Sequence, residues 1–112
     1  MESNLIKLEQ ISKLQNNWNG YGVEPFSNGL IDKCIDIIKG LKVQPFLSPT
    51  GRSSIQMEYE NGSTYLEFEV FIDKIIIFHI DRNNNETNFE ICIDENTTNT
   101  LNSAIEDFYL EK

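Results

Sequence analysis

Two alternating segments separated by Asn61-Gly62 constrain this fold more than any other feature of the sequence. Residues 55–60 read IQMEYE and residues 66–72 read LEFEVFI. Apolar residues at every second position are typical of strands with one buried face. Asn-Gly is the preferred pair for a two-residue hairpin turn, and such a turn here sets Met57 opposite Leu66. The pattern therefore predicts an antiparallel hairpin.

The next strand, from Ile75 to Asp81, is apolar at nearly every position, so only the loop before it can set its facing. A two-residue turn at Asp73-Lys74 places His79 beside Phe68 in the core. A loop one residue longer sends His79 outward, opposite Glu67. We predict the longer loop. The core face of the sheet then comprises Ile55, Met57, Leu66, Phe68, Val70, Phe78, Ile91 and Ile93.

Three further segments have the spacing of amphipathic helices, with apolar residues three and four positions apart. The first extends from about residue 4 to residue 17, and the second from about 27 to 41. The third has an apolar face around Leu101 and Phe108. Polar residues that can cap these helices are Ser3, Asn4, Ser27, Asn28, Asp94, Asn96 and Thr97.

The remaining segments complete an α+β domain. Residues 44–51 contain two prolines and a glycine, which predicts a connector. A polar loop over 82–87 leads to a fourth strand at 89–93. We therefore predict a single domain, 1–112, with two N-terminal helices, a four-stranded antiparallel meander sheet and a C-terminal helix, in the order ααββββα.

The charge balance excludes one class of partner. Eighteen acidic residues against nine basic ones give a net charge of −9, which opposes direct binding to nucleic acid. The acidity either serves solubility or attracts a basic patch on a protein partner. The start of the chain has no leader-like pattern and no apolar run reaches membrane-spanning length, so we expect a cytoplasmic protein. In that reducing setting Cys34 and Cys92 are interpreted as buried thiols.

The sequence contains one histidine, so a His-dependent reaction would have to use His79, with Glu67 as its neighbour. No third orienting group or nucleophile accompanies them, and a cross-strand surface pair is the favoured interpretation. Glu58, Glu67 and Glu69 could hold a divalent cation, but they stand on a flat strand face with no enclosing loop. We therefore predict no catalytic residue, no metal and no cofactor.

On the chosen register, several large side chains point away from the core beside the acidic group. Such an apolar patch edged by carboxylates is typical of a protein interface. The alternative is that the first helix crosses to this face and buries it, and both interpretations stay open. The predicted partner-binding residues are Glu58, Tyr65, Glu67, Glu69, Phe71, Ile75 and Ile77.

Short motifs carry a resemblance to a group of small bacterial and mobile-element proteins. Residues 17–22 read NWNGYG, 48–50 read SPT, 55–59 read IQMEY and 66–70 read LEFEV. The group shares the pattern NWDGYGA, PT, I-x-LEW and LEIEI, and has no assigned biochemical function. The resemblance covers roughly residues 14–80. It departs at residues 51–54, where the group is glycine-rich, and at Tyr59, where the group has Trp.

Together these features predict a non-enzymatic, acidic protein-binding module. The resemblance implies an inhibitor, antitoxin or immunity-type role in a phage or defence-related locus. One alternative is a small enzyme or ligand-binding protein that uses His79 with Glu67, or a pocket near Trp18 and Tyr21. Another is a homo-oligomer that pairs through its apolar face or through an edge strand at residues 55–59. A mimic of nucleic acid is disfavoured because the acids are spread over every element.

Overall fold

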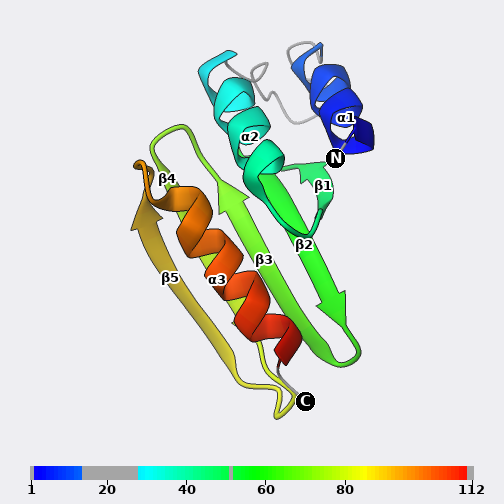
Figure 1. The fold of residues 1–112 in the computed structure, drawn as a ribbon, viewed down its shortest axis with the longest axis vertical. Helices are drawn as coiled ribbons and strands as arrows, with labels where there is room; N and C mark the ends of the chain where they lie inside the picture. The colour runs from blue at the N-terminus through cyan, green and yellow to red at the C-terminus, as the bar shows by residue number, and fades with distance from the viewer. Residues whose placement is uncertain (1, 14–27, 51, 111–112) are drawn as a thin grey trace.

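The computed structural model of the chain describes residues 2–13, 28–50 and 52–110. Within these ranges the fold has three helices and one antiparallel sheet in which each strand pairs with the next in the chain (Figure 1). The predicted α+β class and the meander are confirmed, with five strands in place of four. The elements are α1 (Glu2–Ser12), α2 (Asn28–Gly40), β1 (Phe46–Pro49), β2 (Ile55–Asn61), β3 (Thr64–Val70), β4 (Lys74–Ile80), β5 (Glu86–Cys92) and α3 (Thr97–Leu110).

The additional strand, β1, lies in the segment predicted to be a connector. Its register sets Leu47 opposite Met57, and Leu47 is fully buried. Pro49 is tolerated there because an edge strand has one side without ladder hydrogen bonds. Four residues are too few to show a period of two, which is why the sequence pattern missed β1. As a result β2 is an interior strand, so residues 55–59 are not the sheet edge that one predicted mode of homo-oligomer pairing required.

The hairpin of β2 and β3 is confirmed, with a different turn. Asn61 pairs with Thr64, so the turn residues are Gly62-Ser63 and Met57 lies opposite Phe68. Gly62 has a φ of 64°, which suits the first turn position of a two-residue hairpin loop of type II′. This register differs from the prediction by two residues. Because the side-chain period is also two, the predicted core face is preserved.

The predicted register of β3 and β4 is wrong, and here the error is an odd number of residues. Phe68 pairs with Ile77 and Leu66 with His79. The connection is a two-residue turn closed by the Phe71 amide, which donates to the Lys74 carbonyl at 2.9 Å. A one-residue change of register reverses every side chain of a strand. Hence Ile77 lies in the core and His79 lies on the same side of the sheet.

Helix α1 packs against α2 and β1 on the core side of the sheet (Figure 1). Leu8 and Ile11 are buried in the same cluster as the apolar face of α2. Asn4, which was predicted as a possible helix cap, is buried instead, and its Nδ2 donates to the Pro45 carbonyl at 3.0 Å. The described part of α1 therefore does not cross to the opposite face. The predicted residues 14–17 of this helix lie outside the described ranges.

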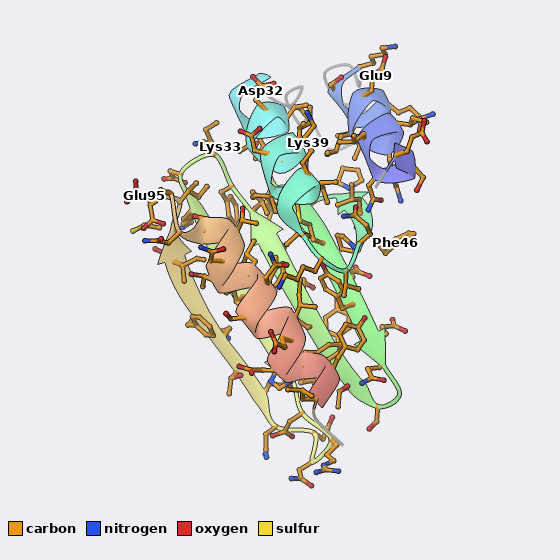
Figure 2. The ribbon with its side chains drawn as sticks, viewed as in Figure 1. Glu9, Asp32, Lys33, Lys39, Phe46 and Glu95 are labelled. Atoms are coloured by element: carbon orange, nitrogen blue, oxygen red, sulfur yellow. The ribbon has the colours of Figure 1, made fainter. Side chains whose placement is uncertain are left out.

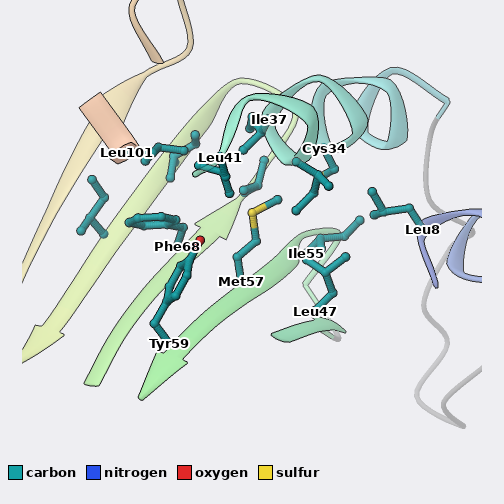
Figure 3. Close-up of a cluster of buried hydrophobic side chains, with 14 of the residues drawn as sticks. Leu8, Cys34, Ile37, Leu41, Leu47, Ile55, Met57, Tyr59, Phe68 and Leu101 are labelled. Carbon is teal, nitrogen blue, oxygen red and sulfur yellow. The ribbon is translucent and has the colours of Figure 1, made fainter. Parts of the chain in front are cut away.

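The core is formed between the sheet and the helices (Figure 3), where Met57 and Phe68 are fully buried. Helix α3 is capped by a reciprocal pair of hydrogen bonds. The Asp94 carboxylate accepts from the Asn96 amide at 2.8 Å, and the Thr97 hydroxyl accepts from the Asp94 amide at 2.7 Å. The two bonds join Asp94 to the start of α3, so Asp94 and Thr97 from the predicted candidates both take part in closing this end of the helix.

The facing of β4 can be tested with two neighbouring isoleucines. Ile77 is 2% exposed, whereas Ile76 is half-buried on the other face. We expect Ile77→Ala to lower the free energy of unfolding by about 2–5 kcal/mol because it leaves a cavity. Ile76→Ala should cost only about 1 kcal/mol, since less apolar surface is lost. Urea unfolding followed by circular dichroism measures both, and the reverse order would contradict the observed register.

The two cysteines differ in accessibility, which corrects their prediction as a buried pair. Cys34 is buried and Cys92 is exposed. Burial raises the pKa of the Cys34 thiol to about 12, so it stays protonated well above neutral pH. Because the thiolate is the nucleophile, we expect iodoacetamide to modify Cys92 alone in the folded protein. Mass spectrometry of the wild type and of Cys92→Ser would show this, and rapid labelling of the folded Cys92→Ser variant would contradict it.

Candidate functional site

The two faces of the sheet differ in what covers them. Helices α2 and α3 lie over one face, and the buried residues of the described helices join one core cluster there (Figure 1). No helix of the described ranges packs on the opposite face. We call this opposite side the open face. Strand register decides which residues reach it, because alternate residues of a strand share a face.

A row of apolar side chains follows β4 along the open face. Ile76, Phe78 and Ile80 alternate with the core residues of the same strand, and all three are half-buried. We call these three residues the apolar stripe. The Phe78 ring packs edge-on against Tyr65 of β3, with ring centroids 6.1 Å apart. The central residue of the stripe is thus one ring of an aromatic pair whose other ring lies on β3.

Carboxylates flank the stripe on both neighbouring strands. Glu67 of β3 lies opposite Phe78, and Glu86 of β5 lies opposite Ile80. Ile76 has an acid on each side, Glu69 on β3 and Glu90 on β5. The open face therefore has an apolar centre between two acidic rows.

Hydrogen bonds hold the β2–β3 side of this face in one arrangement. The Tyr65 hydroxyl donates to Glu67 Oε1 at 2.8 Å and accepts from Gln56 Nε2 at 3.3 Å. Gln56 Nε2 also donates to Glu58 Oε1. Burial first, and then the hydrogen bond to Glu67, raise the pKa of Tyr65, so the phenol remains a neutral donor. Two acids of the face are thereby oriented by neutral side chains.

Glu69 differs from the other acids of the open face because it is buried and paired. Its side chain is 9% exposed, and its Oε2 accepts from the Ser54 hydroxyl at 2.6 Å and from Arg52 Nε at 3.0 Å. Arg52 Nη2 lies 2.9 Å from the same oxygen in an ion pair. Ser54 is itself fully buried and lies 2.5 Å, oxygen to oxygen, from the Thr50 hydroxyl. Glu69 therefore fastens the loop before β2 to β3, and its charge is compensated within the molecule.

The predicted partner-binding residues separate into two groups. Glu58, Tyr65 and Glu67 lie together on the open face, and Phe71 is half-buried with Lys74 Nζ 5.3 Å from its ring centroid. In contrast, two of the predicted apolar anchors are core residues. They are Ile75, 0% exposed, and Ile77, 2% exposed.

The placement of Ile75 and Ile77 as surface anchors was therefore wrong, and its cause is the one-residue difference in the β3–β4 loop. The stripe residues Ile76, Phe78 and Ile80 were missed for the same reason. Because Ile75–Phe78 is a continuous apolar run, no period in it could have identified the outward positions.

His79 and Glu67 do not form the predicted pair. His79 lies opposite Leu66 on the core side, whereas Glu67 lies on the open face. The His79 ring is 6.0 Å from the Phe108 ring and lines an open groove of about 420 Å³ between α3 and the last two strands. Trp18 and Tyr21, predicted near a possible pocket, lie outside the described ranges.

The described part of the chain contains no group of three or more histidine, cysteine or acidic residues that could hold a metal ion. It also contains no helix long and apolar enough to span a membrane.

Comparisons with known proteins returned nothing. No family model, no curated protein and no solved structure matches the chain. The resemblance to the mobile-element group therefore stays a prediction.

The buried Glu69 can be tested through its hydroxyl partner. Ser54→Ala leaves one oxygen of a buried carboxylate without that donor, and we expect a loss of about 1.5–3 kcal/mol in the free energy of unfolding. The matched control is Ser63→Ala in the exposed β2–β3 turn, which should change stability by less than about 0.5 kcal/mol. Chemical denaturation measures both variants. If Ser54→Ala and Ser63→Ala are equally stable, water replaces the lost donor and the Glu69 carboxylate is solvated.

Proposed function

We propose that this chain is a non-catalytic protein-binding module that docks its open face on a partner with a basic rim around an apolar centre. The observation that carries the proposal is the apolar stripe between two rows of carboxylates. The proposal includes the role that the resemblance implies, which is that of an inhibitor, antitoxin or immunity-type protein. Each of these roles needs one molecule to cover a functional surface of another, and a flat sheet face suits that task.

The charges of the open face support a basic partner. Its carboxylates are Glu58, Glu60, Glu67, Glu69, Glu86 and Glu90. Two of the cations beside them are already engaged, because Arg52 pairs with Glu69 at 2.9 Å and Lys74 pairs with Glu90 at 3.6 Å. A third, Lys7, lies 3.9 Å from the ring centroid of Phe46, which is opposite Glu58. The surplus is therefore negative, and it adds to a net charge of −9. Such a field accelerates encounter with a positively charged surface.

The aromatic pair supports a defined anchor at the centre of the face. Binding energy at interfaces concentrates in a few large side chains that become fully desolvated, with Tyr and Trp enriched among them. Phe78 occupies the middle of the stripe and packs edge-on against Tyr65 of the neighbouring strand. Tyr65 is also fixed by its hydrogen bond to Glu67, so little rotational freedom is lost when a partner covers it.

The proposal includes a reducing, cytoplasmic setting. Cys34 and Cys92 are both free thiols, and Cys92 is exposed on β5. An exposed thiol persists where glutathione and thioredoxin keep it reduced.

The test is capture of partners from the native host by immobilised protein, followed by kinetics with the purified partner. We expect Phe78→Ala to speed dissociation by about tenfold to a hundredfold, because a central contact is lost. The double change Glu58→Lys with Glu67→Lys should slow association by about tenfold at low salt and weaken the salt dependence.

A charge-matched control shows whether association depends on the acids of the open face or on the net charge of the whole protein. Glu95→Lys with Glu106→Lys makes the same change in net charge at exposed positions, with Glu95 just before α3 (Figure 2) and Glu106 on α3, and should leave association nearly unchanged. All variants should keep the wild-type circular dichroism spectrum. The proposal fails if the captured partner still binds both open-face variants and is lost only with the control.

A further inference from the structure

The long edge of the sheet, β5, forms a second surface with properties of its own. The strand has seven residues, and no strand of the described ranges pairs with its outer side. Six of the seven residues are exposed. In Figure 1, β5 lies at the margin of the sheet, outside the layer of helices. An edge of this length presents a row of backbone donors and acceptors to a further strand.

The two sides of β5 differ in chemistry. On the core side, Phe89 is 53% exposed and borders the open groove of about 420 Å³ that α3 leaves uncovered. The other lining groups of this groove include Leu66, Ala104 and Phe108. On the open-face side, Glu86 and Glu90 project from the same strand. One side of the edge is thus mainly apolar, with His79, Thr87 and Asp107 also lining the groove, and the other side is acidic.

The edge is also held in place. The Asp81 carboxylate accepts hydrogen bonds from the amides of Asn83 and Asn85, both at 2.9 Å, in the loop that leads into β5. The hydrogen bond from the Asn85 amide is the largest cause of the lowered pKa of Asp81, so this anchor persists at mildly acidic pH. Lys74 and Glu90 connect the strands near the other end of β5.

We propose that β5 binds an extended segment of a protein partner by strand addition, and that this segment alternates lysine or arginine with bulky apolar residues. Its backbone continues the sheet, its apolar side chains enter the groove beside Phe89, and its cations face Glu86 and Glu90. This inference goes beyond the proposed function, because it concerns the edge of the sheet and not the open face.

The charges favour a basic segment over a second copy of this chain. Symmetric antiparallel pairing of two β5 strands about Asn88 sets Glu86 of each copy directly opposite Glu90 of the other. Like charges at directly opposed positions are destabilising. Pairing about Phe89 instead brings the two Glu90 side chains into diagonal positions, on two proteins that each have a net charge of −9. A segment with lysine at those positions converts the same contacts into attraction.

The test uses a synthetic peptide of alternating lysine and isoleucine, matched to the length of β5 and blocked at both ends. Its control has the same side chains with the backbone nitrogens of one edge methylated, so that edge cannot donate hydrogen bonds. We expect the unmodified peptide to bind at least about tenfold more tightly in fluorescence anisotropy, because several hydrogen bonds are lost in the control. Amide hydrogen exchange over residues 86–92 should slow only with the unmodified peptide.

Variants of the chain provide the second arm of the test. Phe89→Ala should weaken the peptide about fivefold, whereas Leu110→Ala, an exposed apolar residue of α3 that does not line the groove, should leave it unchanged. Phe78→Ala should also bind the peptide normally, which separates this inference from the open-face proposal. Equal binding of both peptides overturns it, because attraction of charge alone explains that result. A dimer in analytical ultracentrifugation whose β5 amides are already protected without peptide overturns it as well.

Discussion

The single hydrogen-bonded turn between β3 and β4 fixes which side chains this molecule presents to solvent. The Phe71 amide and the Lys74 carbonyl close a two-residue connection, and that length assigns every residue of β4 to a face. With it, Ile75 and Ile77 belong to the core cluster between the sheet and the helices, and Ile76, Phe78 and Ile80 form the stripe. A connection one residue longer would exchange the two sets and place His79 among the acids. The open face is therefore a consequence of loop length as much as of composition.

The sequence was sufficient for those parts of the fold in which local patterns agree. The alternation of apolar residues in β2 and β3 identified their core face. The observed register differs from the predicted one by two residues, and a shift by an even number leaves Met57 and Phe68 on the same side of the sheet. Helical spacing likewise located α2 and α3, and Asp94 was among the expected caps. In each case the pattern has a period that matches the element, so an error at the boundary does not change the facing.

The parts that could not be predicted lack such a period. β1 is four residues long, and β4 is apolar on both sides. For the candidate site, the acids and Tyr65 were predicted correctly on the open face. In β4, however, Ile75 and Ile77 were predicted to face outward, and their sequence neighbours do so instead. The pairing of Glu69 with Arg52 and Ser54 was also invisible, because it joins residues up to 17 positions apart without a recognisable motif. Charge alone does not show whether a carboxylate is already neutralised.

The meander order has a consequence for the entropy of the chain. Because every strand pairs with its sequence neighbour, the sheet closes only short loops, whose ordering cost is small. The hydrogen bonds that span the largest separations in sequence are made by side chains of α1 and α3. Asn4 reaches Pro45 across 41 positions, and Asn102 donates to the Gly40 carbonyl across 62 while its oxygen accepts from the Lys42 amide. Two asparagine side chains, one in α1 and one in α3, thus bind the same short stretch, from the last residue of α2 to the residue before β1.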